Sequence, residues 1–156
     1  MSGTIANQTY SFLDVQATLV GPGGAISLGS GAGTAEEGIT IERLDDKDSM
    51  VIGSDGTPMH SLHASKAGTV SIRVLKTSPV NFQLATMYAL QTVSSALHGQ
   101  NVLTISDTNR GDVTTCQSVA FRRFTGITYA KDANMNEWAF NAGIIDTLLG
   151  VGRPSI

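Results

Sequence analysis

Two histidines three residues apart, His60 and His63, are the first candidates for chemistry in this chain. Imidazole nitrogens bind zinc-like metals together with thiolates or carboxylates, and Cys116 or Asp55 could complete such a set. The segment around the histidines reads as extended, however, and side chains three residues apart in a strand point to opposite faces. We therefore favour loop or interface histidines and predict no metal site.

A glycine-rich run, Gly29-Ser30-Gly31-Ala32-Gly33, follows a plausible strand, as phosphate-binding loops do. The residues that follow do not fit that chemistry. A phosphate loop needs Lys-Ser or Lys-Thr after its glycines, whereas Glu36 and Glu37 stand here and would repel phosphate. We predict no cofactor, and we attribute the glycines to backbone flexibility or close chain approach.

The remaining reactive groups lack the partners that catalysis requires. Cys116 is the only cysteine and lies in an alternating stretch without a recognisable activating group, and no G-x-S-x-G turn is present. Glu36-Glu37 and Asp45-Asp46 are sequence neighbours, whose carboxylates usually diverge toward solvent. The sequence predicts no enzyme, although a site formed across subunits stays open.

The composition favours self-association. Charged residues make up 15% of the chain, against roughly 25% in typical soluble domains, so few like charges oppose contact between copies. Residues 1–64 hold eight acidic and two basic side chains, while residues 65–156 hold five acidic and eight basic ones. Unlike halves suit head-to-tail packing, although folding could equally average the charges out.

Several function classes are disfavoured by what the composition lacks. Lys and Arg form no dense cluster, so specific DNA or RNA binding is not expected. A lone cysteine indicates a reducing compartment and is expected in the core. Residues 1–8 have neither the basic nor the apolar region of a signal peptide, and no apolar run approaches about 18 residues. We expect neither signal-directed secretion nor a membrane span.

Alternating apolar residues predict a mainly β chain. The predicted strands lie at residues 9–20, 25–28, 39–44, 50–52, 69–75, 101–106, 112–121 and 137–142. In the first strand, Tyr10, Phe12, Val15, Ala17 and Leu19 are expected on buried faces, with a phase slip near Leu13 and Asp14. Gly21-Pro22-Gly23-Gly24 predicts a tight reversal. Residues 29–38 are expected as a loop or an irregular strand edge, and residues 45–66 as an extended loop or hairpin arm.

One helix is predicted at residues 79–97. Ser78 can cap its first N–H groups, Pro79 suits the first helical position and Gly99 suits the end. Because the helix has almost no charge, it must pack against a sheet, another subunit or both. Trp138, Phe140 and Phe121 are expected in the core. The fold class is an antiparallel β-sandwich or barrel with one helix on its side, in a single domain over residues 1–156.

Several segments, in this order, resemble the tail tube (inner tube) proteins of contractile-tailed bacteriophages. They are YSFLDVQATLVGPGGAISLGSGAGTAEEGITIE, VIGSDGTPMHS, VLKTSPVN, SSALHG, YAKD followed by EWAF, and GIIDTLLG. The resemblance implies six subunits closing a ring through sheet edges, with rings stacking into a hollow tube inside a contractile sheath. It further implies tail sheath, baseplate and tail terminator proteins as partners, tape measure protein and DNA in the lumen, and a place in the virion tail after assembly in the host cytoplasm.

The resemblance also suggests residue roles. Ring stacking is expected from the arm, residues 45–66, and from residues 1–8 and 151–156. Within the arm, the stacking candidates are Asp45, Asp46, Lys47, Asp48, Ser49 and Met50. Glu36 and Glu37, with Asp45, Asp46 and Asp48, are candidates for an acidic bore that repels DNA phosphate.

Three other readings stay open. Tube subunits of type VI secretion systems and phage-like bacteriocins resemble these phage proteins, and residue physics separates them poorly. A monomeric β-sandwich that binds a ligand through its Gly-rich loops is a second alternative. An enzyme with an unrecognised site is the third.

Overall fold

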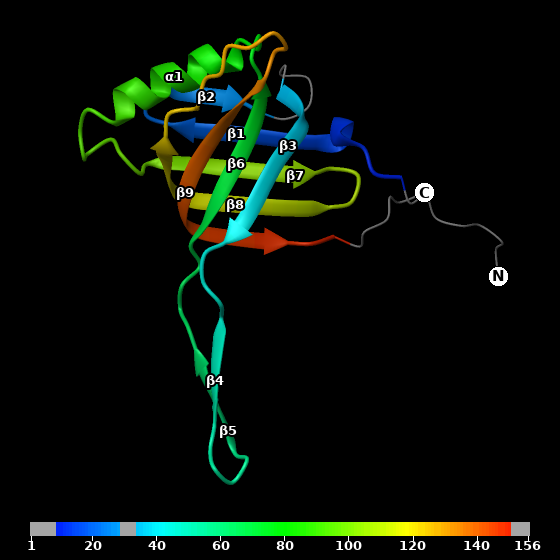
Figure 1. The fold of residues 1–156 in the computed structure, drawn as a ribbon, viewed down its shortest axis with the longest axis vertical. Coiled ribbons are helices and arrows are strands. Elements are labelled where there is room, and N and C mark those ends of the chain that lie inside the picture. The colour runs from blue at the N-terminus through cyan, green and yellow to red at the C-terminus, as the bar shows by residue number, and fades with distance from the viewer. Residues whose placement is uncertain (1–8, 29–33, 151–156) are drawn as a thin grey trace, which may run out of the picture.

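The computed structural model describes residues 9–28 and 34–150 (Figure 1). It is a mainly β structure with one α-helix, as predicted. The elements in chain order are the 3-10 helix η1 (Phe12–Asp14), β1 (Val15–Gly21), β2 (Gly24–Ser27), β3 (Thr34–Arg43), β4 (Asp48–Ile52), β5 (Pro58–Leu62), β6 (Gly68–Leu75), α1 (Val80–Gln91), β7 (Asn101–Asp107), β8 (Asp112–Arg123) and β9 (Met135–Leu148).

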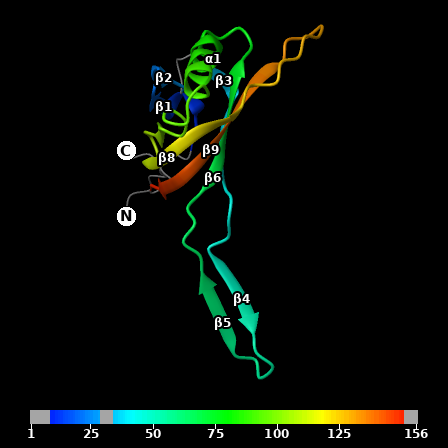
Figure 2. The same ribbon diagram turned by 90° about the vertical axis from the view of Figure 1, so that its left-hand side faces the viewer.

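Seven strands form one antiparallel sheet in the order β2-β1-β7-β8-β9-β6-β3. The sheet folds over, so that β3, β6 and the first half of β9 lie across β1, β7 and β8 (Figure 1). Helix α1 lies beside this folded sheet. We call the seven strands and α1 the body, and β4 and β5 extend from it as a separate two-stranded hairpin (Figure 2).

The core lies between the two layers of the body. Val70, Ile72 and Val74 of β6 are fully buried, as their alternation predicted. Aromatic rings from β8, β9 and α1 pack around Phe121. Its ring lies edge to face with Trp138 at 6.0 Å and with Tyr88 at 5.6 Å between ring centroids, and tilted against Phe140 at 4.8 Å. The predicted core aromatics Phe121, Trp138 and Phe140 are therefore confirmed.

The start of the chain departs from the prediction of one strand over residues 9–20. Residues Phe12–Asp14 form η1, in which the Ser11 hydroxyl accepts the Leu13 N–H at 3.1 Å, and β1 begins only at Val15. Because the 3-10 turn breaks the two-residue period, Tyr10 is 59% exposed and Phe12 only half-buried; the prediction that both are buried was wrong. Val15, Ala17 and Leu19 are buried as expected.

Helix α1 begins at Val80, one residue after the predicted start at Pro79, and ends early. The Ser78 hydroxyl accepts the Val80 N–H at 3.2 Å. The helix stops at Gln91, not at residue 97, and the Thr92 hydroxyl bonds the Tyr88 carbonyl at 2.8 Å. Thr92, Val93, Ser94 and Ser95 are poor helix formers, because β-branching restricts their side chains or hydroxyls compete for backbone groups. The apolar spacing that continues to residue 97 therefore overestimated the length of the helix.

Candidate assembly surfaces

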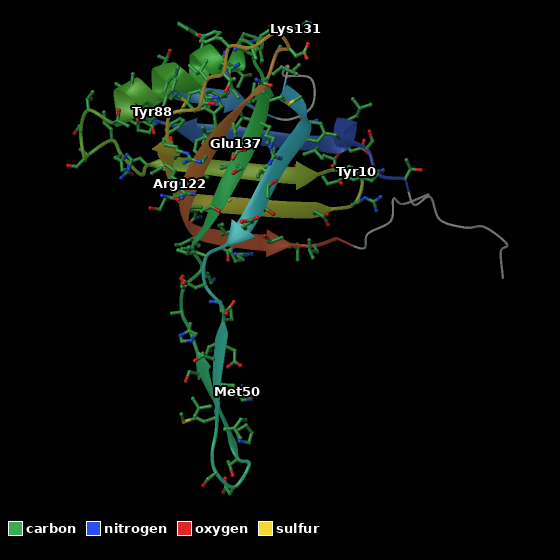
Figure 3. The ribbon with its side chains drawn as sticks, in the orientation of Figure 1. Tyr10, Met50, Tyr88, Arg122, Lys131 and Glu137 are labelled. Atoms are coloured by element: carbon green, nitrogen blue, oxygen red, sulfur yellow. The ribbon has the colours of Figure 1, made fainter. Side chains whose placement is uncertain are left out.

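The arm, residues 45–66, is a hairpin that stands clear of the body (Figure 3). Its strands β4 and β5 pair in the register Asp48↔Leu62, Met50↔His60 and Ile52↔Pro58 on one face, and Ser49↔Ser61 and Val51↔Met59 on the other. Leu62 is 87% exposed, and the other large apolar side chains, Met50, Val51, Ile52 and Met59, are each more than half exposed. Both faces of this small sheet thus present apolar surface that the subunit does not cover.

Local hydrogen bonds shape the tip of the arm. The Gly53 N–H donates to the Thr57 carbonyl at 2.8 Å, and Gly56 adopts a φ of 89°, which favours glycine. The Asp55 carboxylate accepts the Thr57 N–H at 3.0 Å, and this bond lowers the pKa of Asp55 below its usual value. Asp55 is therefore a turn residue rather than a metal ligand.

The root of the arm is fastened to β9. The Lys66 ammonium lies 3.2 Å from the Asp146 carboxylate, and the Lys66 carbonyl accepts the Ile145 N–H at 2.9 Å. Arg43, at the end of β3, donates to the Ile145 carbonyl and, at 3.2 Å, to the Thr147 hydroxyl. Lys47 and His63 are bonded across the hairpin, from the His63 N–H to the Lys47 carbonyl at 2.9 Å. The arm therefore leaves the body in a fixed direction.

The two histidines do not form a metal site. His60 Nδ1 lies 3.0 Å from Asp48 Oδ2, as a cross-strand pair, and His63 is exposed just beyond β5. No group of three or more His, Cys, Asp or Glu side chains within residues 9–28 and 34–150 is arranged to hold a metal ion. Cys116 is fully buried on β8, and burial raises the pKa of its thiol. A buried thiol with a raised pKa is a poor nucleophile.

Among the described residues, two edges of the seven-stranded sheet carry no neighbouring strand. Within residues 9–28 and 34–150, strand β2 pairs with β1 alone and β3 pairs with β6 alone, with a register shift between Thr34 and Ile39. This irregularity fits the sequence prediction for residues 29–38, of which residues 29–33 lie outside the described part. Unpaired N–H and C=O groups along such edges are sites at which another chain can add a strand.

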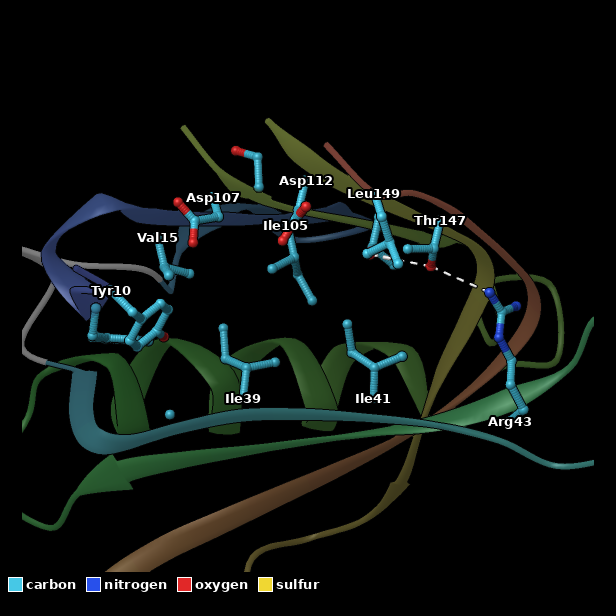
Figure 4. Close-up of a pocket in the computed structure, with 14 residues that line it drawn as sticks. Tyr10, Val15, Ile39, Ile41, Arg43, Ile105, Asp107, Asp112, Thr147 and Leu149 are labelled. Atoms are coloured by element: carbon cyan, nitrogen blue, oxygen red, sulfur yellow. Dashed lines mark hydrogen bonds between the residues drawn. The ribbon is translucent and has the colours of Figure 1, made fainter. Parts of the chain in front are cut away.

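An open groove of about 780 Å³ separates β3 from the ends of β1, β7, β8 and β9. Figure 4 shows Ile39 and Ile41 of β3 facing Val15, Ile105 and Leu149 across the opening. Its two carboxylates are engaged with backbone: Asp107 accepts the Asn109 N–H at 3.1 Å, and Asp112 accepts the Gly150 N–H at 2.8 Å. The groove is therefore an apolar opening with carboxylates in turn-stabilising roles, which is a poor arrangement for catalysis.

A second projection, residues 124–134 between β8 and β9, lies at the end of the body opposite the arm (Figure 2). We call it the crest. Phe124 anchors its base, with ring centroids 5.0 Å from Trp138 and 5.3 Å from Tyr88. Further along, the Lys76 ammonium lies 4.0 Å from the centre of the Tyr129 ring and donates to the Thr128 carbonyl. Sequence reasoning missed the crest; its signal was two aromatics in a segment without strand or helix periodicity.

The residues predicted for ring stacking lie together in the arm, whereas the residues predicted for the bore are divided between the arm and β3. Asp45, Asp46 and Lys47 lead into the arm, and Asp48, Ser49 and Met50 open β4; all six are exposed. Glu36 and Glu37 fall within β3, but their side chains lie outside the described part, as do residues 1–8 and 151–156. Within the described residues, no helix is long and apolar enough to cross a membrane.

These features define a class of protein: a β-sandwich subunit with two sheet edges that no described strand covers and a projecting hairpin. The family model of the bacteriophage PhiTE tail tube protein matches residues 7–150. The chain belongs to this tail tube family, so it is a structural protein of the phage tail. No curated protein matches the chain significantly.

Three solved structures with a similar fold are described as parts of contractile injection systems or of the anti-feeding prophage. A sheath–tube complex of an extracellular contractile injection system, in its extended state, has 11% identity and a TM-score of 0.57, over 90% of this chain and 92% of that one. The tube-terminating cap of the anti-feeding prophage has 9% identity and a TM-score of 0.57, over 96% and 97%. A sheath/tube terminator of an injection system has 12% identity and a TM-score of 0.55, over 90% and 96%.

Proposed function

We propose that the chain closes into hexameric rings, and that these rings stack into the hollow inner tube of a contractile phage tail. The observation that carries the proposal is the arm. An isolated two-stranded hairpin is at best marginally stable in water, yet this one exposes apolar side chains on both faces. Such a hairpin is stabilised when it packs on another subunit, and its projection beyond the body suits contact with the next ring.

The two open sheet edges suit closure within a ring. The β2 edge of one subunit and the β3 edge of its neighbour would each satisfy free backbone groups, and a ring leaves no end unpaired. Because two different edges meet, β2 of one subunit and β3 of the next, the contact is heterologous. Such a contact gives a closed ring when the rotation from one subunit to the next divides a full turn. Six copies are what the resemblance to contractile tail tubes implies.

The bore of such a tube would be the conduit for genomic DNA during ejection and would enclose the tape measure protein beforehand. Tail sheath, baseplate and tail terminator proteins are the proposed outer and end partners, with assembly in the host cytoplasm. Glu36 and Glu37 are proposed to face the lumen, where their charge would keep a moving duplex from adhering. Asp45, Asp46 and Asp48 belong to the arm and are proposed for stacking instead.

Negative-stain electron microscopy of the purified protein at rising concentration tests this function. We expect rings at low concentration and hollow tubes at high concentration, with six-fold symmetry in end views. Sedimentation velocity on the same samples measures the mass of the smallest ring. A species that stays monomeric at the highest soluble concentration would contradict the proposal and favour a β-sandwich that binds a ligand, with the groove beside β3 as its site.

A second candidate is the tube of a contractile injection system, since one of the similar solved structures is described as the sheath–tube complex of such a system. Purified particles distinguish the two. A particle that contains a DNA-filled head supports the phage tail, whereas headless particles with a loaded or empty tube support the injection system.

A further inference from the structure

We infer that the arm of one subunit docks on the crest of a second copy, so that the tube has a built-in polarity. This inference rests on the proposed stacking and names its acceptor. Figure 3 shows Met50 of the arm and Lys131 of the crest at opposite ends of the long axis. Head-to-tail stacking along this axis brings the crest end of one subunit to the arm end of the other. When the arm lies alongside that next subunit, its root comes beside the crest.

The crest contacts the body at two points. Its base is fixed by the contacts of Phe124 with Trp138 and Tyr88, and its middle by the Lys76 ammonium over the Tyr129 ring. Tyr129 is nevertheless 84% exposed, and Ile127 is half exposed. A projection that contacts the body at two points and exposes aromatic and aliphatic groups suits an acceptor, because these contacts reduce the conformational freedom lost on binding.

Charge complementarity selects the crest as the arm's partner. The arm holds four acidic side chains, Asp45, Asp46, Asp48 and Asp55, and two basic ones, Lys47 and Lys66. Lys66 is paired with Asp146, which leaves the arm root acidic. The crest and its base hold Arg122, Arg123, Lys131 and Asp132, with Lys76 beside them. The ion pairs within the described residues include none for Asp45, Asp46 or Lys131.

The contact thus combines two parts. At the root, Asp45 and Asp46 face the ammonium of Lys131 on the next subunit. Beyond the root, the apolar side chains of β4 and β5 pack on that subunit near Ile127 and Tyr129. The apolar part supplies most of the affinity, whereas the charged part fixes which end meets which, because like ends bring acidic against acidic or basic against basic.

A charge exchange tests the pairing. Lys131→Glu alone, and Asp45→Lys with Asp46→Lys, are each expected to leave rings intact and to raise the protein concentration needed for tube growth at least about tenfold, since the contact repeats around every ring. The triple variant restores opposite charges and should recover tube growth. Lys131→Arg is the matched control and should behave as wild type.

Tube length by negative stain and ring content by sedimentation separate the outcomes. Wild-type tubes should also shorten as NaCl rises from about 50 to 500 mM, where screening weakens exposed pairs. If both single-end variants grow tubes at the wild-type concentration, or if the triple variant fails to recover, the arm–crest pairing is wrong while stacked rings stand. If the wild-type chain forms no rings, both the proposed function and this inference are wrong.

Discussion

At the scale of single residues, one buried amide pair joins three elements. Asn101 Nδ2 donates to Gln91 Oε1 at 2.7 Å, and Gln91 Nε2 donates to Asn101 Oδ1 and to the Pro22 carbonyl, each at 2.8 Å. Both amides are almost fully buried. Gly21 lies against Asn101, where a Cβ would fall 1.8 Å from Asn101 Oδ1. The pair therefore holds the end of α1 against the β1–β2 turn and the start of β7.

Asn101→Ala should cost about 1–3 kcal/mol of unfolding free energy, because it leaves the buried Gln91 amide without its partner. Urea unfolding followed by tryptophan fluorescence of Trp138 measures the loss. The double variant Gln91→Leu, Asn101→Leu is the control, because it removes both polar groups together. If the two amides depend on each other, the double variant loses less unfolding free energy than the single variants Gln91→Leu and Asn101→Leu lose in sum. A loss equal to that sum would mean that the amides act independently.

Cys116 permits a prediction about pH. Burial raises the pKa of its thiol in the folded state, so the unfolded chain loses the proton at a lower pH than the folded chain. The contribution of Cys116 to the free energy of unfolding is present below the pKa of the unfolded thiol, about 8.5. It is lost as pH rises through the pKa of the folded thiol. Native protein should therefore react with a thiol reagent far more slowly than urea-unfolded protein at pH 8. Equal rates would show that β8 opens readily.

At the scale of elements, the sequence was informative where one face of a strand is buried. The alternation of Val70, Ile72 and Val74 located β6, because only one register buries all three. It was uninformative where local hydrogen bonds determine the backbone conformation, as at Ser11, which caps η1, and at Thr92, just after the end of α1. The groove and the crest could not be predicted, since both depend on how distant strands fold over one another.

The arm can be removed without disturbing the body. Lys47 and His63 are paired across the hairpin, so replacing Asp48–Leu62 with Asn-Gly leaves a closed two-residue turn at the root. This variant should keep the melting temperature of wild type within a few degrees, because all the deleted strand residues lie outside the core. It should form rings but no long tubes by negative stain. Normal tubes from the armless chain would place stacking elsewhere.

A matched control keeps the arm but removes the apolar side chains of one of its two faces. Replacing Met50, Ile52 and Leu62 by Ser leaves the backbone pairing and every charge in place. Since these side chains are exposed in the subunit, ring formation should be unchanged and tube growth weakened. A triple serine variant that grows tubes like wild type would mean that stacking does not depend on this face of the arm.

At the scale of the whole molecule, the charge of the bore concerns DNA movement rather than assembly. Glu36→Lys with Glu37→Lys would turn a repelling surface into one that binds phosphate, so phage built with it should assemble tails yet eject DNA slowly. Gln83→Lys with Thr86→Lys, on the exposed face of α1, is the control for added positive charge. Plaque counts and the rate of DNA release from triggered particles measure the effect. Because DNA contacts only the lumen, the α1 control should eject normally. If both variants ejected DNA at the same rate, Glu36 and Glu37 would not line the bore.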